Sequence, residues 1–145
     1  MSTTIEKLSS IEQRISSKKD RFRLFALFLR EDAPNRWDLV VSAPWLDENE
    51  QKGLNYLVKQ IKLDLTTQEF VWLSRIIVAR EGSAILEAMK QVEGSHLVLQ
   101  NVQLPGILVK EAYIISSHPK RTRSNAKSSP PKRKKAKKQK KNKVS

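Results

Sequence analysis

The segment FRLFALFLR, residues 22–30, constrains the fold of this chain more than any other stretch. Apolar side chains fill both alternating sets of positions between Leu24 and Leu29. A β-strand that is apolar on both faces has to be covered on both faces, so it belongs in the middle of a sheet. The run is far shorter than the roughly 20 apolar residues that cross a bilayer, so we assign it to a folded core.

The elements that flank this strand follow from apolar spacing. Residues 3–17 predict an amphipathic helix, because their apolar residues recur at helical intervals. These residues are Ile5, Leu8, Ile11 and Ile15. Residues 37–43, WDLVVSA, alternate as a strand. The turn residues of 31–36 favour an antiparallel hairpin between this strand and the central one.

The rest of the apolar pattern predicts two more helices and three more strands. A helix begins near Asp47, with Glu50 completing a motif like a capping box, and continues to Leu65. Residues 66–69, TTQE, read as a break before a strand at 70–80. Ser83 is expected to cap a helix over 82–94 that ends at Gly94. Two strands then flank Pro105-Gly106, and because L-Pro-Gly suits a type II turn we expect a loop of about four residues there.

The predicted order is therefore α-β-β-α-β-α-β-β. The simplest packing is an α/β (mixed α+β) fold with a single five-stranded mixed sheet and helices packed on it. We divide the chain into an amino-terminal helix (1–19), a small mixed α/β domain (20–118) and a lysine-rich tail (119–145). Two roles remain open for the amino-terminal helix, which either covers the sheet or exchanges with a second copy of the chain.

Charge is distributed very unevenly along the chain. Residues 120–145 hold 13 of the 28 Lys and Arg residues and none of the 15 Asp and Glu residues. The formal net charge of +13 therefore belongs entirely to this segment, and residues 1–119 are formally neutral. The tail has too few apolar residues to offset the entropy of ordering, so we expect it to be disordered when free.

A polycation of this kind binds polyphosphates by releasing condensed counterions. We therefore predict a non-enzymatic protein that associates with DNA or RNA through the basic residues of its tail. These residues are Lys120, Arg121, Arg123, Lys127, Lys132, Arg133, Lys134, Lys135, Lys137, Lys138, Lys140, Lys141 and Lys143. Lysine lacks the planar fork that reads guanine edges, and the tail has no aromatic residue for stacking, so sequence-independent binding is expected.

Other roles for the tail stay open. PPKRKKAKK fits a nuclear import signal if the source is eukaryotic. A membrane role is weaker, because the tail has neither an apolar anchor nor a cysteine for acylation. The remaining hypothesis is that the tail is a solvated extension without specific function. In that case we expect the domain to be a protein-interaction adaptor. Since the amino terminus lacks the apolar core of a signal peptide, we expect an intracellular, cytoplasmic protein, bound to nucleoid or ribosome in a bacterium or nuclear in a eukaryote.

The domain itself carries few residues in catalytic patterns. Its glycines are isolated, so no Walker A or GxGxxG loop exists, and the chain has no cysteine. The two histidines, His96 and His118, stand far apart without metal-binding spacing, so we expect no metal and no cofactor. We assign no catalytic residue.

Two single residues remain as candidates. A metal-dependent nuclease-like enzyme is the third function left open, because Asp38 lies on a predicted strand as one acid of such a site would, although the next strand supplies no second acid. We therefore expect Asp38 to be a solvent-side or edge residue paired with Arg75. Trp45, between Pro44 and Leu46, is the tryptophan expected to be partly exposed, as core packing or as an interface for a protein partner or a second copy.

Overall fold

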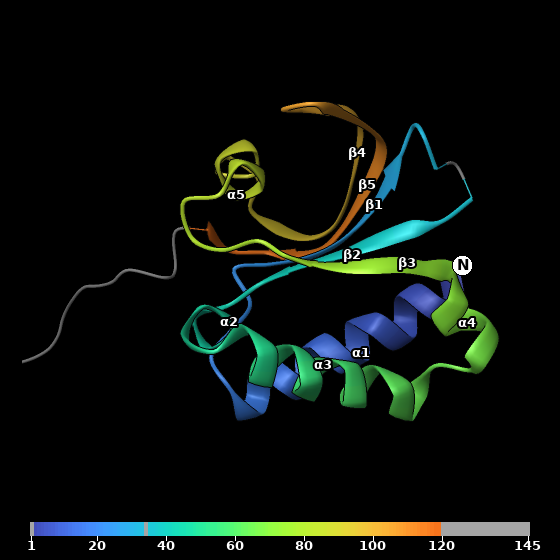
Figure 1. Ribbon diagram of the computed structural model, residues 1–145, viewed down its shortest axis with the longest axis vertical. Coiled ribbons are helices and arrows are strands. Elements are labelled where there is room, and N and C mark those ends of the chain that lie inside the picture. The colour runs from blue at the N-terminus through green and yellow to red at the C-terminus, as the bar shows by residue number, and fades with distance from the viewer. Residues whose placement is uncertain (1, 34, 120–145) are drawn as a thin grey trace, which may run out of the picture.

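The computed structural model of the protein describes residues 2–33 and 35–119. It has one five-stranded sheet with the strand order β3-β2-β1-β5-β4 (Figure 1). The strands are β1 (Leu24–Arg30), β2 (Trp37–Ser42), β3 (Leu73–Val78), β4 (Gly94–Leu104) and β5 (Ile107–Ser117). The helices are α1 (Ser2–Lys18), α2 (Pro44–Glu48), α3 (Glu50–Asp64), α4 (Thr67–Trp72) and α5 (Ala84–Ala88).

The predicted mixed sheet and its central strand are confirmed. β1 lies in the middle and pairs antiparallel with β2 and with β5, whereas β2 and β3 are parallel. The hairpin between β1 and β2 is also as predicted. Leu24 to Leu27 are completely buried, because each face of the sheet has its own core.

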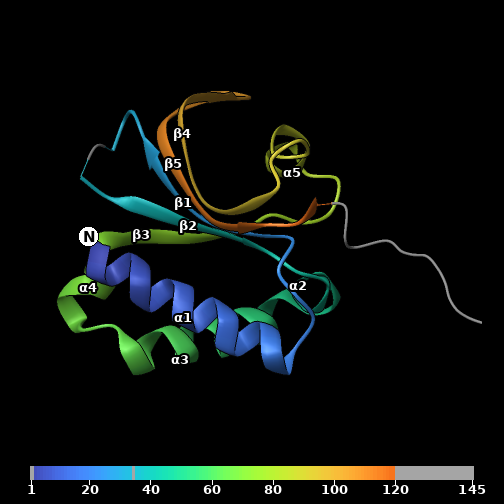
Figure 2. The same ribbon diagram turned by 180° about the vertical axis from the view of Figure 1, so that it is seen from behind.

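Helices α1 and α3 lie side by side across the first of these faces (Figures 1 and 2). The apolar stripe of α1 packs with α3 against the face formed by Phe25 and Leu27, and we call this cluster the first core. Leu8, Ile11 and Ile15 of that stripe are completely buried. Of the two roles left open for the amino-terminal helix, covering the sheet is the one observed.

Glu69 of α4 ties α1 to the rest of the domain. One of its carboxylate oxygens accepts a hydrogen bond from Lys7 Nζ at 2.8 Å, and the other accepts one from the Thr4 hydroxyl at 3.0 Å. The backbone N–H of Thr66 donates to the same carboxylate at 2.9 Å. These bonds, led by that from Lys7, lower the pKa of Glu69 from 4.5 to about 2, because each favours the charged form.

The second face is covered by α5 and by the hairpin of β4 and β5, which curls over it (Figure 1). Leu24, Ala26 and Phe28 of β1 and Ala112 and Ile114 of β5 form this second core.

Two bulges account for the curl. The register between β1 and β5 shifts twice, which leaves Ile115 and Lys110 of β5 without partners on β1. In the register with β4, His96 lies opposite Ile115 and Asn101 opposite Lys110. His96 and Asn101 have left-handed backbones, with φ of 56° and 55°. An extra residue increases the local twist of a strand, so two bulges five residues apart bend the whole hairpin.

Several predicted boundaries are wrong, and local hydrogen bonds explain two of them. Asn49 caps α3 by accepting from the N–H of Lys52, whereas Asp47, the predicted cap, forms an ion pair with Arg23. The predicted break at 66–69 is the capping box of α4, with Thr66 and Glu69 bonded reciprocally. Residues 70–72 are consequently helical, and β3 begins only at Leu73.

The carboxyl-terminal half differs in two further places. Ser83 does cap α5, but the helix ends at Ala88 and Gly94 begins β4. The loop between β4 and β5 is two residues long, because Leu104 and Ile107 are paired. Gly106 has φ +76°, as a type II turn requires, and the side-chain amide of Gln103 bonds the carbonyls of Leu104 and Ile107 across the turn.

None of the helices that the structure describes is long and apolar enough to cross a membrane. The predicted disorder of the tail concerns residues that, apart from Pro119, lie outside the described ranges.

Candidate nucleic-acid interface

The point from which the tail departs lies against the basic segment 18–23. The backbone N–H of His118 donates to the carbonyl of Arg23 at 2.8 Å. The Arg21 guanidinium contacts His118 Nε2 at 3.3 Å. Arg21 is exposed, so a cation of the folded domain lies beside the residues that precede the lysine-rich sequence.

Arg23 belongs to the fold, although the sequence groups it with these cations. Its side chain is 4% exposed, and its guanidinium forms an ion pair with Asp47 at 2.6 Å. This pair joins the entry to β1 with α2. Arg23 is therefore not accessible to a polyphosphate, in contrast to the exposed cations Lys18, Lys19 and Arg21.

Trp45 lies half-buried beside the same segment. Its indole N–H donates to the carbonyl of Asp20 at 3.1 Å, and its ring makes an edge contact with Phe22 of the first core. A Cβ at Gly53 would lie 2.7 Å from Leu46 Cδ2 and 3.2 Å from Trp45 Cε3, so a larger residue would crowd both side chains. The glycine therefore lets α3 approach the indole, and these contacts fix the position of Trp45.

A groove of about 270 Å³ opens beside Trp45, and we call it the Trp45 groove. Its residues are Lys19, Trp45, Glu48, Asn49, Lys52, Gly53 and Tyr56. The rings of Trp45 and Tyr56 stand at 90° to each other, with their centroids 5.9 Å apart. Lys19 Nζ lies 5.3 Å from the centroid of Trp45 and 4.8 Å from that of Tyr56, which are cation–π distances. Aromatic rings beside lysines form the combination that stacks unpaired bases and neutralises phosphates.

Most arginines elsewhere in the described chain are neutralised by acids. The ion pairs are Arg14–Asp64, Arg23–Asp47, Arg30–Asp32, Arg30–Asp38, Arg75–Asp38 and Arg80–Glu50. The lysine pairs are Lys7–Glu69 and Lys90–Glu87. Pairing of this kind leaves little unbalanced positive charge on the folded surface, in agreement with its neutral composition.

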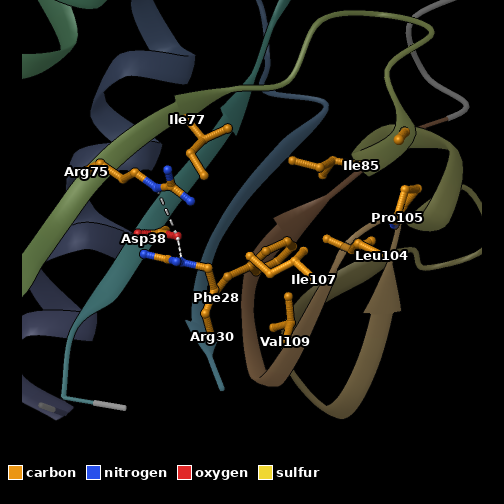
Figure 3. A pocket seen from close by; sticks show the side chains of 11 residues that line it. Phe28, Arg30, Asp38, Arg75, Ile77, Ile85, Leu104, Pro105, Ile107 and Val109 are labelled. Atoms are coloured by element: carbon orange, nitrogen blue, oxygen red, sulfur yellow. Dashed lines mark hydrogen bonds and ion pairs between the residues drawn. The ribbon is translucent and has the colours of Figure 1, made fainter. Parts of the chain in front are cut away.

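Asp38 is buried, and the predicted solvent-side or edge position is wrong. It is 1% exposed on β2, which has a neighbour on each side. One oxygen, Oδ2, accepts from Arg30 Nε at 2.8 Å and contacts Arg75 Nε at 3.3 Å (Figure 3), which confirms the predicted pairing with Arg75. Among the described residues Asp38 contacts two guanidiniums and no second carboxylate, so the nuclease pattern is not assembled there.

The fold places the two histidines on one groove, which sequence spacing did not indicate. His96 and His118 line one groove of about 410 Å³ between α1 and the end of β5, with Glu12 among its other residues. His96 Nδ1 lies 3.2 Å from the Tyr113 hydroxyl. Among residues 2–33 and 35–119 there is no group of three or more His, Cys, Asp or Glu side chains arranged to hold a metal ion.

The tail residues named above lie outside the described part of the chain, so their contacts are not defined. Comparison with protein-family models, with curated proteins and with solved structures finds no match to this chain. The functional proposal accordingly rests on the chemistry of the chain's own residues.

Proposed function

We propose that this is a non-enzymatic nucleic-acid-associated protein. Residues 120–145 bind the phosphate backbone without sequence preference, and the neutral α/β domain contributes contacts of its own. The observation that carries the proposal is the separation of charge. The excess of 13 positive charges lies in 26 residues without one acid, while the arginines of the folded domain are largely ion-paired.

The Trp45 groove supports a second contact with the same nucleic acid. The contacts of Arg21 and Arg23 with His118 tie segment 18–23 to the beginning of the tail, and the bond from Trp45 to Asp20 ties the groove to that segment. A strand held by the tail is therefore presented to Trp45 and Tyr56 at high effective concentration. Base stacking needs an unpaired base, so we expect the groove to favour single strands.

Binding of labelled single-stranded and duplex oligonucleotides tests this proposal. The full chain is compared with residues 1–119 and with a full-length variant in which the tail lysines are replaced by glutamine. Both changes are expected to weaken binding at 50 mM salt by about 10³-fold or more, because they remove the release of counterions. If residues 1–119 bind as tightly as the full chain, the folded surface is responsible and the proposal fails.

Trp45→Leu tests the groove separately. Leucine retains apolar packing against Phe22 but offers no ring, so single-strand affinity should fall by about 5- to 150-fold, the range for one stacked base, with little change for duplex. Trp72→Leu is the matched control, because Trp72 is 37% exposed but lies on α4. Equal effects of both substitutions on both oligonucleotides would contradict a base-stacking role for Trp45.

A protein-protein adaptor is the second candidate, and one observation favours it. Leu63, Val71 and Trp72 are 73%, 56% and 37% exposed on the adjoining helices α3 and α4. Exposed large apolar side chains on neighbouring elements are typical of contact surfaces. The adaptor hypothesis predicts a co-purifying protein that stays bound to residues 1–119 and is lost in Val71→Glu.

A further inference from the structure

The concave face of the curled sheet encloses a pocket that the proposed function does not use. The edge strands β3 and β4 do not pair with each other, and α5 and the turn between β4 and β5 close the space between them (Figures 1 and 3). The pocket has a volume of about 190 Å³. Its apolar walls come from five different elements and include Phe28, Ile77, Ile85, Leu104, Ile107 and Val109.

The size and lining of the pocket limit what it can bind. Drug-sized ligands occupy about 300–1,000 Å³, so this pocket takes something smaller. An apolar cavity of about 150 Å³ accommodates a benzene ring, which sets the scale for the apolar body of a ligand here. A single ring or a short branched chain therefore fits the pocket.

One end of the pocket is lined by charged side chains. Arg30 and Arg75 flank Asp38 there, so two guanidiniums face one buried carboxylate (Figure 3). Asp32, which is 69% exposed, also contacts Arg30, so two acids formally balance the two guanidiniums. Attraction for an anion therefore depends on hydrogen-bond donors that these ion pairs leave unused.

Arg75 has hydrogen-bond donors that its ion pair with Asp38 does not use. Its side chain is 52% exposed, and among the residues that the structure describes its ion pair is made through Nε. Nη1 and Nη2 make no hydrogen bond to any described residue. Figure 3 shows the guanidinium between Asp38 and Ile77, on the border between the charged end and the apolar wall. A planar guanidinium edge in this position matches the two oxygens of a carboxylate.

We propose that this pocket binds a small organic monocarboxylate with an apolar body, such as an arylacetic or short branched-chain acid. The apolar body occupies the space between Phe28, Ile85 and Ile107. The carboxylate accepts hydrogen bonds from Nη1 and Nη2 of Arg75, while Asp38 holds the guanidinium in position through Nε. This binding is independent of nucleic acid, because it uses none of the residues of the tail or of the Trp45 groove.

Titration calorimetry of the full chain tests the proposal with phenylacetate as probe. Phenylacetamide is its uncharged counterpart, and acetate carries the charge without the ring. Phenylacetate should bind about 10- to 100-fold more tightly than phenylacetamide, since a charged hydrogen-bonded pair is lost in the amide. Acetate should show no saturable binding. Equal affinity for the acid and the amide, or no binding of phenylacetate at millimolar concentration, would overturn the proposal.

Three variants separate the pocket from the cationic tail. Arg75→Gln should remove the preference for the acid over the amide, and Ala84→Leu, which places a larger side chain at the exposed rim of the pocket, should weaken both ligands. Arg80→Gln, which alters an ion pair with Glu50, is the control and should change neither. Unfolding temperatures verify that each variant is folded. If Ala84→Leu leaves the affinity unchanged, phenylacetate binds elsewhere and the assignment is wrong.

Discussion

Replacement of Asp38 by asparagine should destabilise the domain substantially. Asp38 is 2% exposed at its side chain, and its partner Arg30 is 17% exposed, so the substitution leaves a largely buried guanidinium without its closest counter-charge. Breaking a buried pair by removing one partner costs about 3–5 kcal/mol. Because Arg30 also reaches the exposed Asp32, we expect a smaller loss of about 2–4 kcal/mol.

Arg75→Gln provides the internal comparison. Arg75 is 52% exposed and its Nε lies 3.3 Å from Asp38, so this pair resembles a surface salt bridge worth about 0–1 kcal/mol. Urea denaturation followed by circular dichroism measures both variants. An Asp38→Asn loss below about 0.5 kcal/mol, or one no larger than that of Arg75→Gln, would refute the reasoning about burial.

Three further predictions concern stability. Ile11→Ala should lower the free energy of unfolding by about 2–5 kcal/mol, because Ile11 is completely buried. Leu63→Ala, at 73% exposure, should lower it by less than about 0.5 kcal/mol. Urea midpoints of both variants test the packing of α1. Glu69 has a lowered pKa, so its contribution is complete above pH 4.5 and is lost as the pH falls toward 2; urea midpoints from pH 5 to 2 should fall less steeply in Glu69→Gln. Gly106→Ala should cost about 1 kcal/mol by thermal unfolding, from backbone strain alone, because nothing lies within 4 Å of the added Cβ.

The centre of the fold was predictable because its signals are local and strong. An apolar run on both faces placed β1 in the middle of the sheet, and helical spacing identified the buried stripe of α1. The beginning of α4 is also marked in the sequence by a capping motif. Thr66 and Glu69 have the spacing of a capping box. The aromatic and β-branched residues that follow suggest a strand instead. In the structure the capping bonds form, and residues 67–72 are helical.

The curl of the β4–β5 hairpin is harder to predict from the sequence. Each bulge shifts the alternation by one residue, so Leu97 and Leu99 face the second core and, beyond Asn101, so do Val102 and Leu104. A pattern that changes phase looks merely irregular in a single sequence. The apolar pocket and the groove shared by the two histidines both depend on tertiary placement of these strands, so neither was predicted.

The salt dependence of oligonucleotide binding tests the central claim most directly. If roughly six to ten tail charges engage duplex DNA, a plot of log affinity against log salt should have a slope of about −5 to −9 for the full chain. Affinity would then fall by about 10³- to 10⁵-fold between 50 and 200 mM salt. Residues 1–119 should bind weakly and with a nearly flat slope. The same steep slope in the truncated protein would show that the attraction to phosphate arises from the folded domain.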